Sequence, residues 1–321
     1  MEYFSDIIGL ALSTLRTSAP LILAGLAGLF CERSGIVNIA LEGKMLVAAF
    51  AAFMVSATLV PIMPSIAAAC AGLAAGLVVG GLMALIHGAS TITFRGDQVV
   101  SGVAINLLAA GMTTFLYRNL IEATNKRNLM EGGSELAAGE FSGYGLEYLF
   151  VVLALLAVPL VWWVTWHTRF GMRVSAVGEA PEAADTAGIS VVSTRYKAVL
   201  ISGLLCGIAG ASLVLTGAGK FGPDMTANRG YIALAALIFA RWRPVATLGS
   251  CLLFGFFTAL SDRVGSYQFN FDDAGWLYYV EEGLGNFFLA LPFILTVVAL
   301  ALFAGRAVAP RAIGTPYIKE R

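Results

Sequence analysis

Polar and charged side chains interrupt the apolar runs of this chain most densely at Glu32–Gly43. This segment reads ERSGIVNIALEG and separates the apolar stretches SAPLILAGLAGLF and KMLVAAFAAFMVSATLV. Charge at membrane depth is costly, so such a cluster marks either a sharp turn at the interface or a functional pathway. Asn38 and Glu42 are four residues apart and would share one face of a helix. They either orient the turn before the next apolar run or contact a polar solute, and we favour the structural role.

Other polar residues lie singly within or beside apolar runs. A lone amide such as Asn106 either hydrogen-bonds a neighbouring helix or faces a polar path, and the sequence leaves both open. His87 and His167 each directly follow an apolar segment, which is typical of solvated histidines at the interface. The candidates for lining a solute path are Asn38, Glu42, Asn106, Thr113 and Thr114.

Motifs of common catalytic sites are missing from the sequence. The nearest approach to a P-loop, Gly219-Lys220, has Val214 in place of the first glycine and Phe221 in place of Ser or Thr. Neither HExxH nor GxSxG occurs. The four cysteines include no CxxC pair, so we expect neither a metal site nor a disulfide framework. We therefore expect a protein that is not an enzyme and has no catalytic residues.

The composition is that of a polytopic helical membrane protein. Of the 321 residues 58% are hydrophobic and 12% charged, with a mean hydropathy of +0.82. A helix of about 20 apolar residues crosses the hydrocarbon core, and the alternating strands of a membrane barrel are absent from the sequence. We predict one transmembrane domain, 1–321, an all-α bundle of about nine spans: 7–30, 40–60, 66–87, 98–117, 147–166, 196–216, 229–240, 246–261 and 284–304.

The seventh predicted span is short, so it either extends toward Met225 or is a half-helix packed against the eighth. Glycines four residues apart, as at Gly72 and Gly76 or Gly203 and Gly207, predict close helix packing.

Most of the 20 Lys and Arg residues fall on one side of the predicted spans, which makes that side cytoplasmic. The C-terminus is then inside, and with nine spans the N-terminus is outside. The links 118–147 and 261–283 on the other side are acidic. This reflects either the exclusion of Lys and Arg from the outer side or a surface for a partner protein. Lys+Arg and Asp+Glu both number 20, so the net charge does not indicate a nucleic-acid partner.

The longest predicted cytoplasmic link, about 168–197, contains a short helix. Pro181 suits its first turn, and Glu182 and Asp185 suit its positive N-terminal end. Gly188 supplies a left-handed stop, and we expect the helix to be bracketed by Gly178 and Gly188. A face of small residues suits insertion into a groove of a partner, whereas the alternative is an ordinary solvated connector. That face would consist of Ala180, Ala184 and Ala187.

Four blocks of the sequence resemble the permease subunits of ABC importers, in particular the nucleoside and simple-sugar branch related to ribose and branched-chain amino-acid permeases. The blocks are SGIVNIALEG, FRGDQVVSGVAINLLAAGMTTFL, FGMRVSAVGEAPEAADTAGI and APRAIGTPY. The resemblance runs from about Ser18 to the C-terminus. Within this branch the chain resembles the shorter of two non-identical permeases that pair with each other. A nucleoside-like solute is implied, with riboflavin or a simple sugar as alternatives.

The resemblance further implies a multi-pass protein of the bacterial cytoplasmic (inner) membrane that works with three partners. These are a second, non-identical permease, a cytoplasmic ABC ATPase with two nucleotide-binding domains, and an extracytoplasmic solute-binding lipoprotein or periplasmic protein. ATP and Mg²⁺ would be used by the ATPase, and this chain would bind no cofactor. The family's coupling helix, which would enter a groove of the ATPase, corresponds to Gly178, Glu179, Pro181, Glu182, Ala184, Asp185 and Gly188.

The main alternative is a secondary transporter or channel that acts without ATP. It would need ion-coupling carboxylates deep inside the spans, and the sequence has none away from the ends of the apolar runs. A purely structural membrane subunit is a third possibility, and only the resemblance disfavours an exporter.

Overall fold

The computed structural model describes residues 2–130, 135–139, 148–266 and 308–319, with the single positions 287, 290, 294, 297 and 298. Within these residues the chain forms helices and turns and no strand, which confirms the predicted all-α class. The α-helices are α1 (Glu2–Arg33), α2 (Leu41–Leu59), α3 (Ser65–Gly88), α4 (Gln98–Leu116), α5 (Ala123–Met130), α6 (Leu149–His167), α7 (Arg169–Glu179), α8 (Pro181–Thr186), α9 (Val191–Leu213), α10 (Arg229–Phe239) and α11 (Pro244–Ser266). The π-helical turns are η1 (Ala89–Thr93), η2 (Tyr117–Glu122) and η4 (Val214–Ala218).

Seven segments of the described chain are long and apolar enough to cross a membrane, and they match the first six predicted spans and the eighth. The predicted polytopic bundle is therefore confirmed. The seventh span, α10, has only 11 residues, a length of about 16 Å at 1.5 Å per residue. The ninth predicted span, 284–304, lies outside the described residues except for scattered positions.

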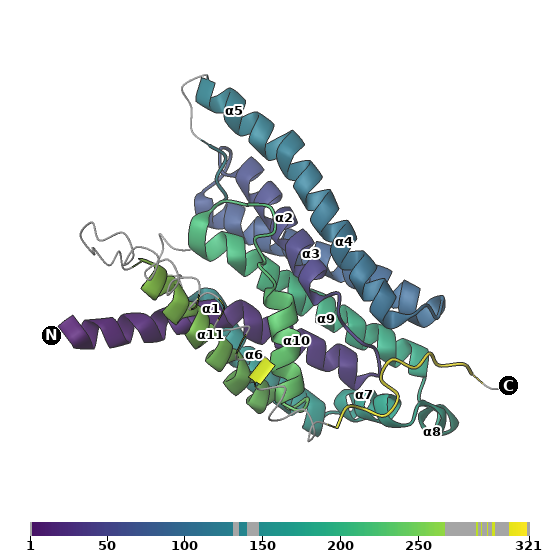
Figure 1. Cartoon of the computed structure of the whole chain (residues 1–321). Coiled ribbons are helices and arrows are strands. Elements are labelled where there is room, and N and C mark those ends of the chain that lie inside the picture. The colour runs from purple at the N-terminus through teal and green to yellow at the C-terminus, as the bar shows by residue number, and fades with distance from the viewer. Residues whose placement is uncertain are drawn as a thin grey trace.

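The fourth span is longer than predicted. Its helix continues from α4 through η2 and α5, so 118–126 is helical and not part of a link. No Gly or Pro stands between Leu116 and Lys126, so nothing in the sequence interrupts the helix there. Figure 1 shows α4 and α5 as one long rod along the side of the bundle.

Glycine contacts bring α3 and α9 together at the centre of the bundle. A Cβ atom on Gly80 would lie 2.5 Å from the carbonyl oxygen of Gly203, and one on Gly207 would lie 2.7 Å from that of Gly76. Only glycine allows backbones to approach so closely, which confirms the predicted close packing. Around this centre α2 packs against α3, α4 and α9, while α1 packs against α6, α9, α10 and α11.

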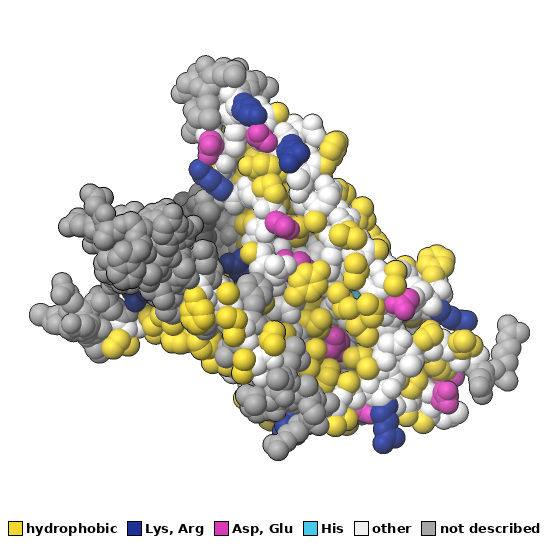
Figure 2. All heavy atoms as spheres, viewed as in Figure 1, with side chains coloured by type: hydrophobic (Ala, Val, Ile, Leu, Met, Phe, Trp, Pro, Cys, Tyr) yellow, Lys and Arg dark blue, Asp and Glu magenta, His cyan; other side chains and the backbone are white. Residues whose placement is uncertain are grey.

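The outer faces of the helices are apolar, as expected of surfaces that meet lipid. Figure 2 shows hydrophobic side chains spread over much of one face of the molecule. On α4 the exposed residues include Val103, Leu107 and Phe115. The two ends of the bundle differ: α5 lies at one end, and α7, α8 and the C-terminal segment lie at the opposite end (Figure 1).

Candidate functional site

The segment between α1 and α2 re-enters the bundle. The Asn38 side chain is completely buried, and its Nδ2 donates a hydrogen bond to the hydroxyl oxygen of Ser202 at 2.8 Å. Ser202 lies at the middle of α9, far from either end of that helix. The predicted break between the two helices is confirmed. Unlike a turn exposed at the interface, the segment is buried, and the chain continues inward before α2 begins at Leu41.

Side-chain amides of α4 satisfy the non-helical backbone of this re-entrant segment. The Gln98 Oε1 accepts from the Val37 N–H at 2.7 Å. Asn106 donates to the carbonyl oxygen of Ile39 at 2.9 Å and accepts from the Gly43 N–H at 2.8 Å. Irregular backbone inside a membrane needs such partners because water is absent. Asn106 also donates to the Tyr231 hydroxyl at 2.8 Å, so its amide joins three segments.

A buried polar cluster fixes the start of α2. The Nζ of Lys44 lies 2.8 Å from the Asn38 Oδ1 and 2.9 Å from the His87 Nδ1, and both side chains and Lys44 itself are 0% exposed. The expectation that His87 is solvated is therefore wrong, because α3 turns this histidine toward Lys44. His167, by contrast, is exposed and lies 4.7 Å from Trp162, measured between ring centroids.

The carboxylate of Glu42 caps the short helix α10. Its Oε2 accepts from the Gly230 N–H at 2.6 Å, and its Oε1 accepts from the Asn228 N–H at 2.9 Å. A negative charge is favourable at a helix N-terminus. The backbone of Asn228 is left-handed, with φ of 62°, and stops the helix from extending toward Met225. Of the two predicted alternatives for the seventh span, the structure has the half-helix.

The remaining path candidates lie further along α4. The Thr113 hydroxyl is buried and donates to the carbonyl oxygen of Ala109 at 2.7 Å, while Thr114 is half-buried. The structure gathers Asn38, Glu42 and Asn106 around the start of α2 but places these two threonines apart. Contact of any of the five with solute stays a prediction.

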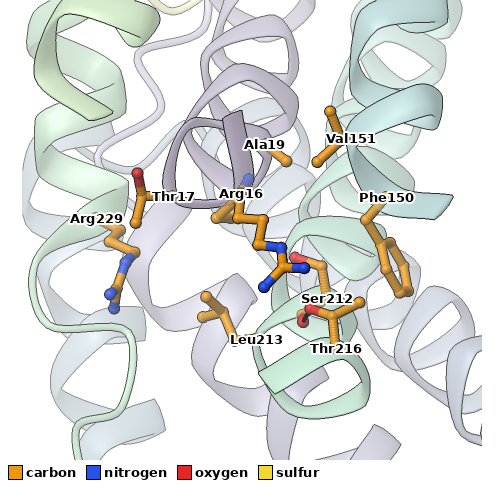
Figure 3. A pocket seen from close by; sticks show the side chains of 10 residues that line it. Arg16, Thr17, Ala19, Phe150, Val151, Ser212, Leu213, Thr216 and Arg229 are labelled. Atoms are coloured by element: carbon orange, nitrogen blue, oxygen red, sulfur yellow. Dashed lines mark hydrogen bonds between the residues drawn. The ribbon is translucent and has the colours of Figure 1, made fainter. Parts of the chain in front are cut away.

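A hollow with a polar lining, which the sequence did not reveal, lies where α1, α6, α9 and α10 meet. Its volume is about 270 Å³, just below the roughly 300–1,000 Å³ usual for small-molecule sites. Figure 3 shows Arg16 reaching in the direction of Ser212 and Thr216, with Arg229 on the other side. The one feature of the sequence that could have indicated this hollow was the position of Arg16 inside an apolar run. The residues around the hollow are Arg16, Thr17, Ala19, Pro20, Phe150, Val151, Ser212, Leu213, Thr216 and Arg229.

The loop after α9 is tied to the segment 135–139. The Ala138 N–H donates to the carbonyl oxygen of Gly219 at 2.7 Å, and the Lys220 Nζ lies 2.6 Å from the Glu135 Oε2. The hydrogen bond with Glu135 and the charge of that carboxylate raise the pKa of Lys220. These contacts hold the chain where it leaves η4 and approaches α10.

The predicted coupling helix exists as α8, with Pro181 in its first turn and a left-handed Gly188 (φ of 81°) after its end. Two expectations about its surroundings are wrong. Gly178 lies inside a further helix, α7, which begins after the side chain of Thr168 caps the Gly171 N–H at 3.1 Å. Ala184 is only 4% exposed, so the three alanines do not form one exposed face.

The exposed surface instead includes Glu182 and Ala183 of α8 and Ala187, which directly follows the helix. Ala184 packs inward against Val177 and Val191, because α8 folds back on α7 and α9. The other predicted coupling residues are likewise partly exposed and partly buried. Glu179 is exposed, Pro181 and Asp185 are half-buried, and Gly188 is exposed.

The C-terminal segment 308–319 ties α7 and α8 to the re-entrant segment. The Ala312 N–H donates to the carbonyl oxygen of Gly178 at 2.9 Å, and the Gly314 N–H donates to that of Gly35 at 3.1 Å. Tyr317 packs beside Ala184. Partial desolvation and the neighbouring carboxylate of Asp185 raise the pKa of the Tyr317 hydroxyl.

Arg195 joins the same parts from within. It is 1% exposed, and its Nε donates to the carbonyl oxygen of Ser34 at 3.1 Å. Its Nη1 donates to the carbonyl oxygen of Thr315 at 3.3 Å. The start of the re-entrant segment, α9 and the C-terminal segment therefore form one connected unit beside α8.

The fold and these sites define a multi-pass helical membrane protein whose interior holds a re-entrant segment and a half-helix, as expected of a transport permease. Residues 10–306 match the model of the family described as "Branched-chain amino acid transport system / permease component", and the chain belongs to this family. It is therefore a permease component of an ABC transporter, which works with other subunits and is not itself an enzyme.

Named relatives match over most of the chain. The guanosine ABC transporter permease protein NupQ of Bacillus subtilis is 40% identical, with 96% of each chain covered. The nucleoside ABC transporter permease protein NupC of Lactococcus lactis is 36% identical, with 95% of each covered. A second Bacillus subtilis protein, the guanosine ABC transporter permease protein NupP, is 30% identical over 65% of this chain and 60% of its own length.

Proposed function

We propose that this chain is one of two permeases in an ATP-driven importer of nucleosides. The substrate class is supported by the names of NupQ and NupC, which match this chain almost from end to end. The observation that carries the coupling to ATP is α8, a short helix at one end of the bundle (Figure 1). Several of its residues are exposed.

The proposed ATPase-docking surface consists of α8 and the turn after it. Glu182 and Ala187 are exposed there, and the left-handed Gly188 ends the helix abruptly. Docking transmits force only through a stiff element. The packing of Ala184 and the contacts of the C-terminal segment supply that stiffness, since they tie α8 to the body of the bundle.

The transporter would also contain a second, non-identical permease and an extracytoplasmic solute-binding lipoprotein or periplasmic protein. The similarity to both NupQ and NupP, two guanosine permeases of one organism, supports the pairing of unlike permeases. A cytoplasmic ATPase with two nucleotide-binding domains would bind ATP and Mg²⁺. The importer would lie in the bacterial cytoplasmic membrane, with the C-terminus inside and the N-terminus outside, as the distribution of Lys and Arg favours.

Coupling is tested with the double variant Glu182→Arg/Ala187→Trp, in which the charge is reversed and bulk is added on the exposed side of α8. We expect the tagged permease to lose the co-purifying ATPase and ATP-dependent nucleoside uptake to fall about tenfold or more, the loss that about 1.4 kcal/mol of binding energy produces. Ala184 is left unchanged because its side chain is buried.

The control is Glu122→Arg/Ala123→Trp, the same pair of changes at the other end of the bundle, where Glu122 is half-buried beside Lys126 and Ala123 is exposed. It should retain the ATPase and near-normal uptake. Unchanged ATPase recovery and uptake in the α8 variant would contradict the proposed docking surface.

A further inference from the structure

We propose that the hollow between α1, α6, α9 and α10 is a binding subsite for the transported solute, at the outer end of its path. The inference rests on the proposed function and deepens it, because it assigns residues of this chain to solute recognition. Those residues are Arg16, Thr17, Ser212, Thr216 and Arg229, of which none was a candidate from the sequence.

The polar groups of the hollow converge from three separate segments. Arg16 comes from α1, Ser212 and Thr216 come from α9 and η4, and Arg229 is the first residue of α10. Phe150 and Val151 of α6 supply an apolar wall, and Figure 3 places them opposite Arg229. A few convergent polar groups beside an apolar wall are the usual make-up of a small-molecule site.

The hydrogen-bonding state of the hydroxyl groups sets the chemistry of the hollow. The Ser212 hydroxyl donates to the Ala209 carbonyl oxygen at 2.7 Å, and the Thr216 hydroxyl donates to the Ser212 carbonyl oxygen at 2.6 Å. Because each proton is engaged by the helix itself, the oxygen lone pairs remain available to accept hydrogen bonds from a solute. The guanidinium groups supply the donors: Arg16 already donates to the Tyr148 hydroxyl, and Arg229 to the carbonyl oxygens of Met225 and Thr226, but each guanidinium carries five N–H groups.

The hollow therefore fits a neutral or anionic solute that carries both hydroxyl groups and carbonyl-type acceptors. Among the described residues that line it none is acidic, so a cationic solute would meet repulsion from two arginines. A nucleoside has the required groups. Its ribose hydroxyls can donate to Ser212 and Thr216, and acceptor atoms of its base can accept from an arginine.

The backbone beside the hollow is irregular, and its residues Asp224, Ala227 and Asn228 are exposed and not covered by the described part of the chain. Asp224, Ala227 and Asn228 have left-handed backbone conformations just before α10 begins. Non-helical backbone at membrane depth is tolerated only where protein covers it or where it lines an aqueous cavity. A second hollow shares Arg16 and Thr17 and extends toward Asp262 of α11.

The competing explanation is a structural one, in which Arg16 serves only to fasten α1 to the start of α6. Its Nη2 donates to the Tyr148 hydroxyl at 3.0 Å, and its guanidinium lies 4.7 Å from the centre of that ring. The test therefore uses Ser212 and Thr216, whose hydroxyl groups donate to carbonyl oxygens of their own helical segment and not to another helix.

The experiment measures initial uptake rates in cells that carry the complete transporter, with Ser212→Ala or Thr216→Val in this chain. We expect KM for guanosine to rise about three- to tenfold in each variant, the effect of one lost hydrogen bond. Thr216→Ser keeps the hydroxyl and should restore KM. The matched control is Thr258→Val, because Thr258 is a half-buried threonine of α11 that donates to the carbonyl oxygen four residues before it.

Unchanged KM in both Ser212→Ala and Thr216→Val, at normal membrane levels of the complex, would overturn the subsite. Uptake of labelled guanosine, riboflavin and glucose is measured in parallel, so that the two proposals can fail separately. A wild-type transporter that takes up glucose and not guanosine would contradict the nucleoside assignment. The subsite would still be supported if KM for glucose rises in the same variants.

Discussion

The carboxylate of Glu42 in the first turn of α2 caps the N-terminus of α10 at Gly230, with 2.6 Å between the Glu42 Oε2 and the Gly230 nitrogen. The two helix starts meet inside the bundle, where a Cβ on Gly230 would lie 2.5 Å from the Glu42 nitrogen. A buried charge of one helix thus stabilises the positive end of another. This contact fixes the half-helix that borders the proposed solute hollow.

Removal of the Glu42 carboxylate should destabilise the permease. Glu42→Ala leaves two N–H groups at Asn228 and Gly230 without their acceptor, at a cost of about 2–3 kcal/mol in the free energy of unfolding. Glu42→Gln keeps one acceptor oxygen and should lose less. The purified permease pair is unfolded with heat or denaturant, and Glu122→Gln, which removes only a partly solvated ion pair with Lys126, serves as the control. Equal stability of Glu42→Ala and the control would refute the cap.

The packing of α3 on α9 predicts opposite effects for two adjacent glycines. Gly80→Ala would place a methyl group 2.5 Å from the backbone oxygen of Gly203, so the helices must separate and assembly should fall severely. Gly81→Ala meets only side-chain atoms at 3.6 Å, an ordinary contact. It should be neutral, or stabilising by about 0.5–1 kcal/mol because alanine favours a helix. The test compares the amounts of folded protein in the membrane for the two variants. Equal amounts of Gly80→Ala and Gly81→Ala would contradict the packing of α3 on α9.

Arg195 should hold the C-terminal segment in place. Arg195 donates from two nitrogens of its planar guanidinium, to the carbonyl oxygens of Ser34 and Thr315. Arg195→Lys keeps the charge, but its single ammonium group cannot reproduce this pair of hydrogen bonds. We expect faster removal of the C-terminal segment by carboxypeptidase and a loss of about 1–2 kcal/mol in stability. Arg173→Lys, on the exposed face of α7, is the matched control. Identical proteolysis rates in the two variants would count against the link.

Asn106 should act as a joint between helices and not as a solute ligand, since its amide groups already bind Ile39, Gly43 and Tyr231. Asn106→Ala should lower the amount of assembled transporter and its stability by about 1–3 kcal/mol. The complex that does assemble should take up solute with unchanged KM. A raised KM at normal assembly would place Asn106 in the path instead.

Much of the bundle could be predicted because apolar length alone determines whether a helix can span the membrane. The spans that correspond to α2 and α3 could be predicted from apolar length alone. Pro181 and Gly188 likewise marked the ends of α8 through local backbone preference, which does not depend on the rest of the fold. Glycine spacing predicted close helix packing for a similar reason, since small residues permit close approach wherever they occur, but it did not predict that α3 would pair with α9.

The burial of particular side chains could not be predicted in this way. His87 looked solvated because it follows an apolar run, and only the position of Lys44 across the helix pair explains its burial. Ala184 looked available for docking, yet α8 folds back so that it faces Val177. Both outcomes depend on contacts between residues far apart in the chain.

The solute hollow could not be predicted from the sequence either. Arg16 and Arg229 are 213 positions apart and come together only because α10 packs along α1. Composition shows an arginine within an apolar run but does not show what lies across from it. The re-entrant course of Ser34–Ala40 was missed for the same reason, because its backbone is satisfied by Gln98 and Asn106 of a distant helix.

Uptake by proteoliposomes tests most directly whether this chain belongs to an ATP-driven nucleoside importer. The vesicles contain both permeases and the ATPase, with the solute-binding protein and labelled guanosine on the opposite side from ATP. We predict accumulation that requires ATP and stops when a catalytically inactive ATPase is substituted. Equal guanosine uptake with the inactive ATPase, or without ATP, would contradict the account and favour a transporter that acts without ATP.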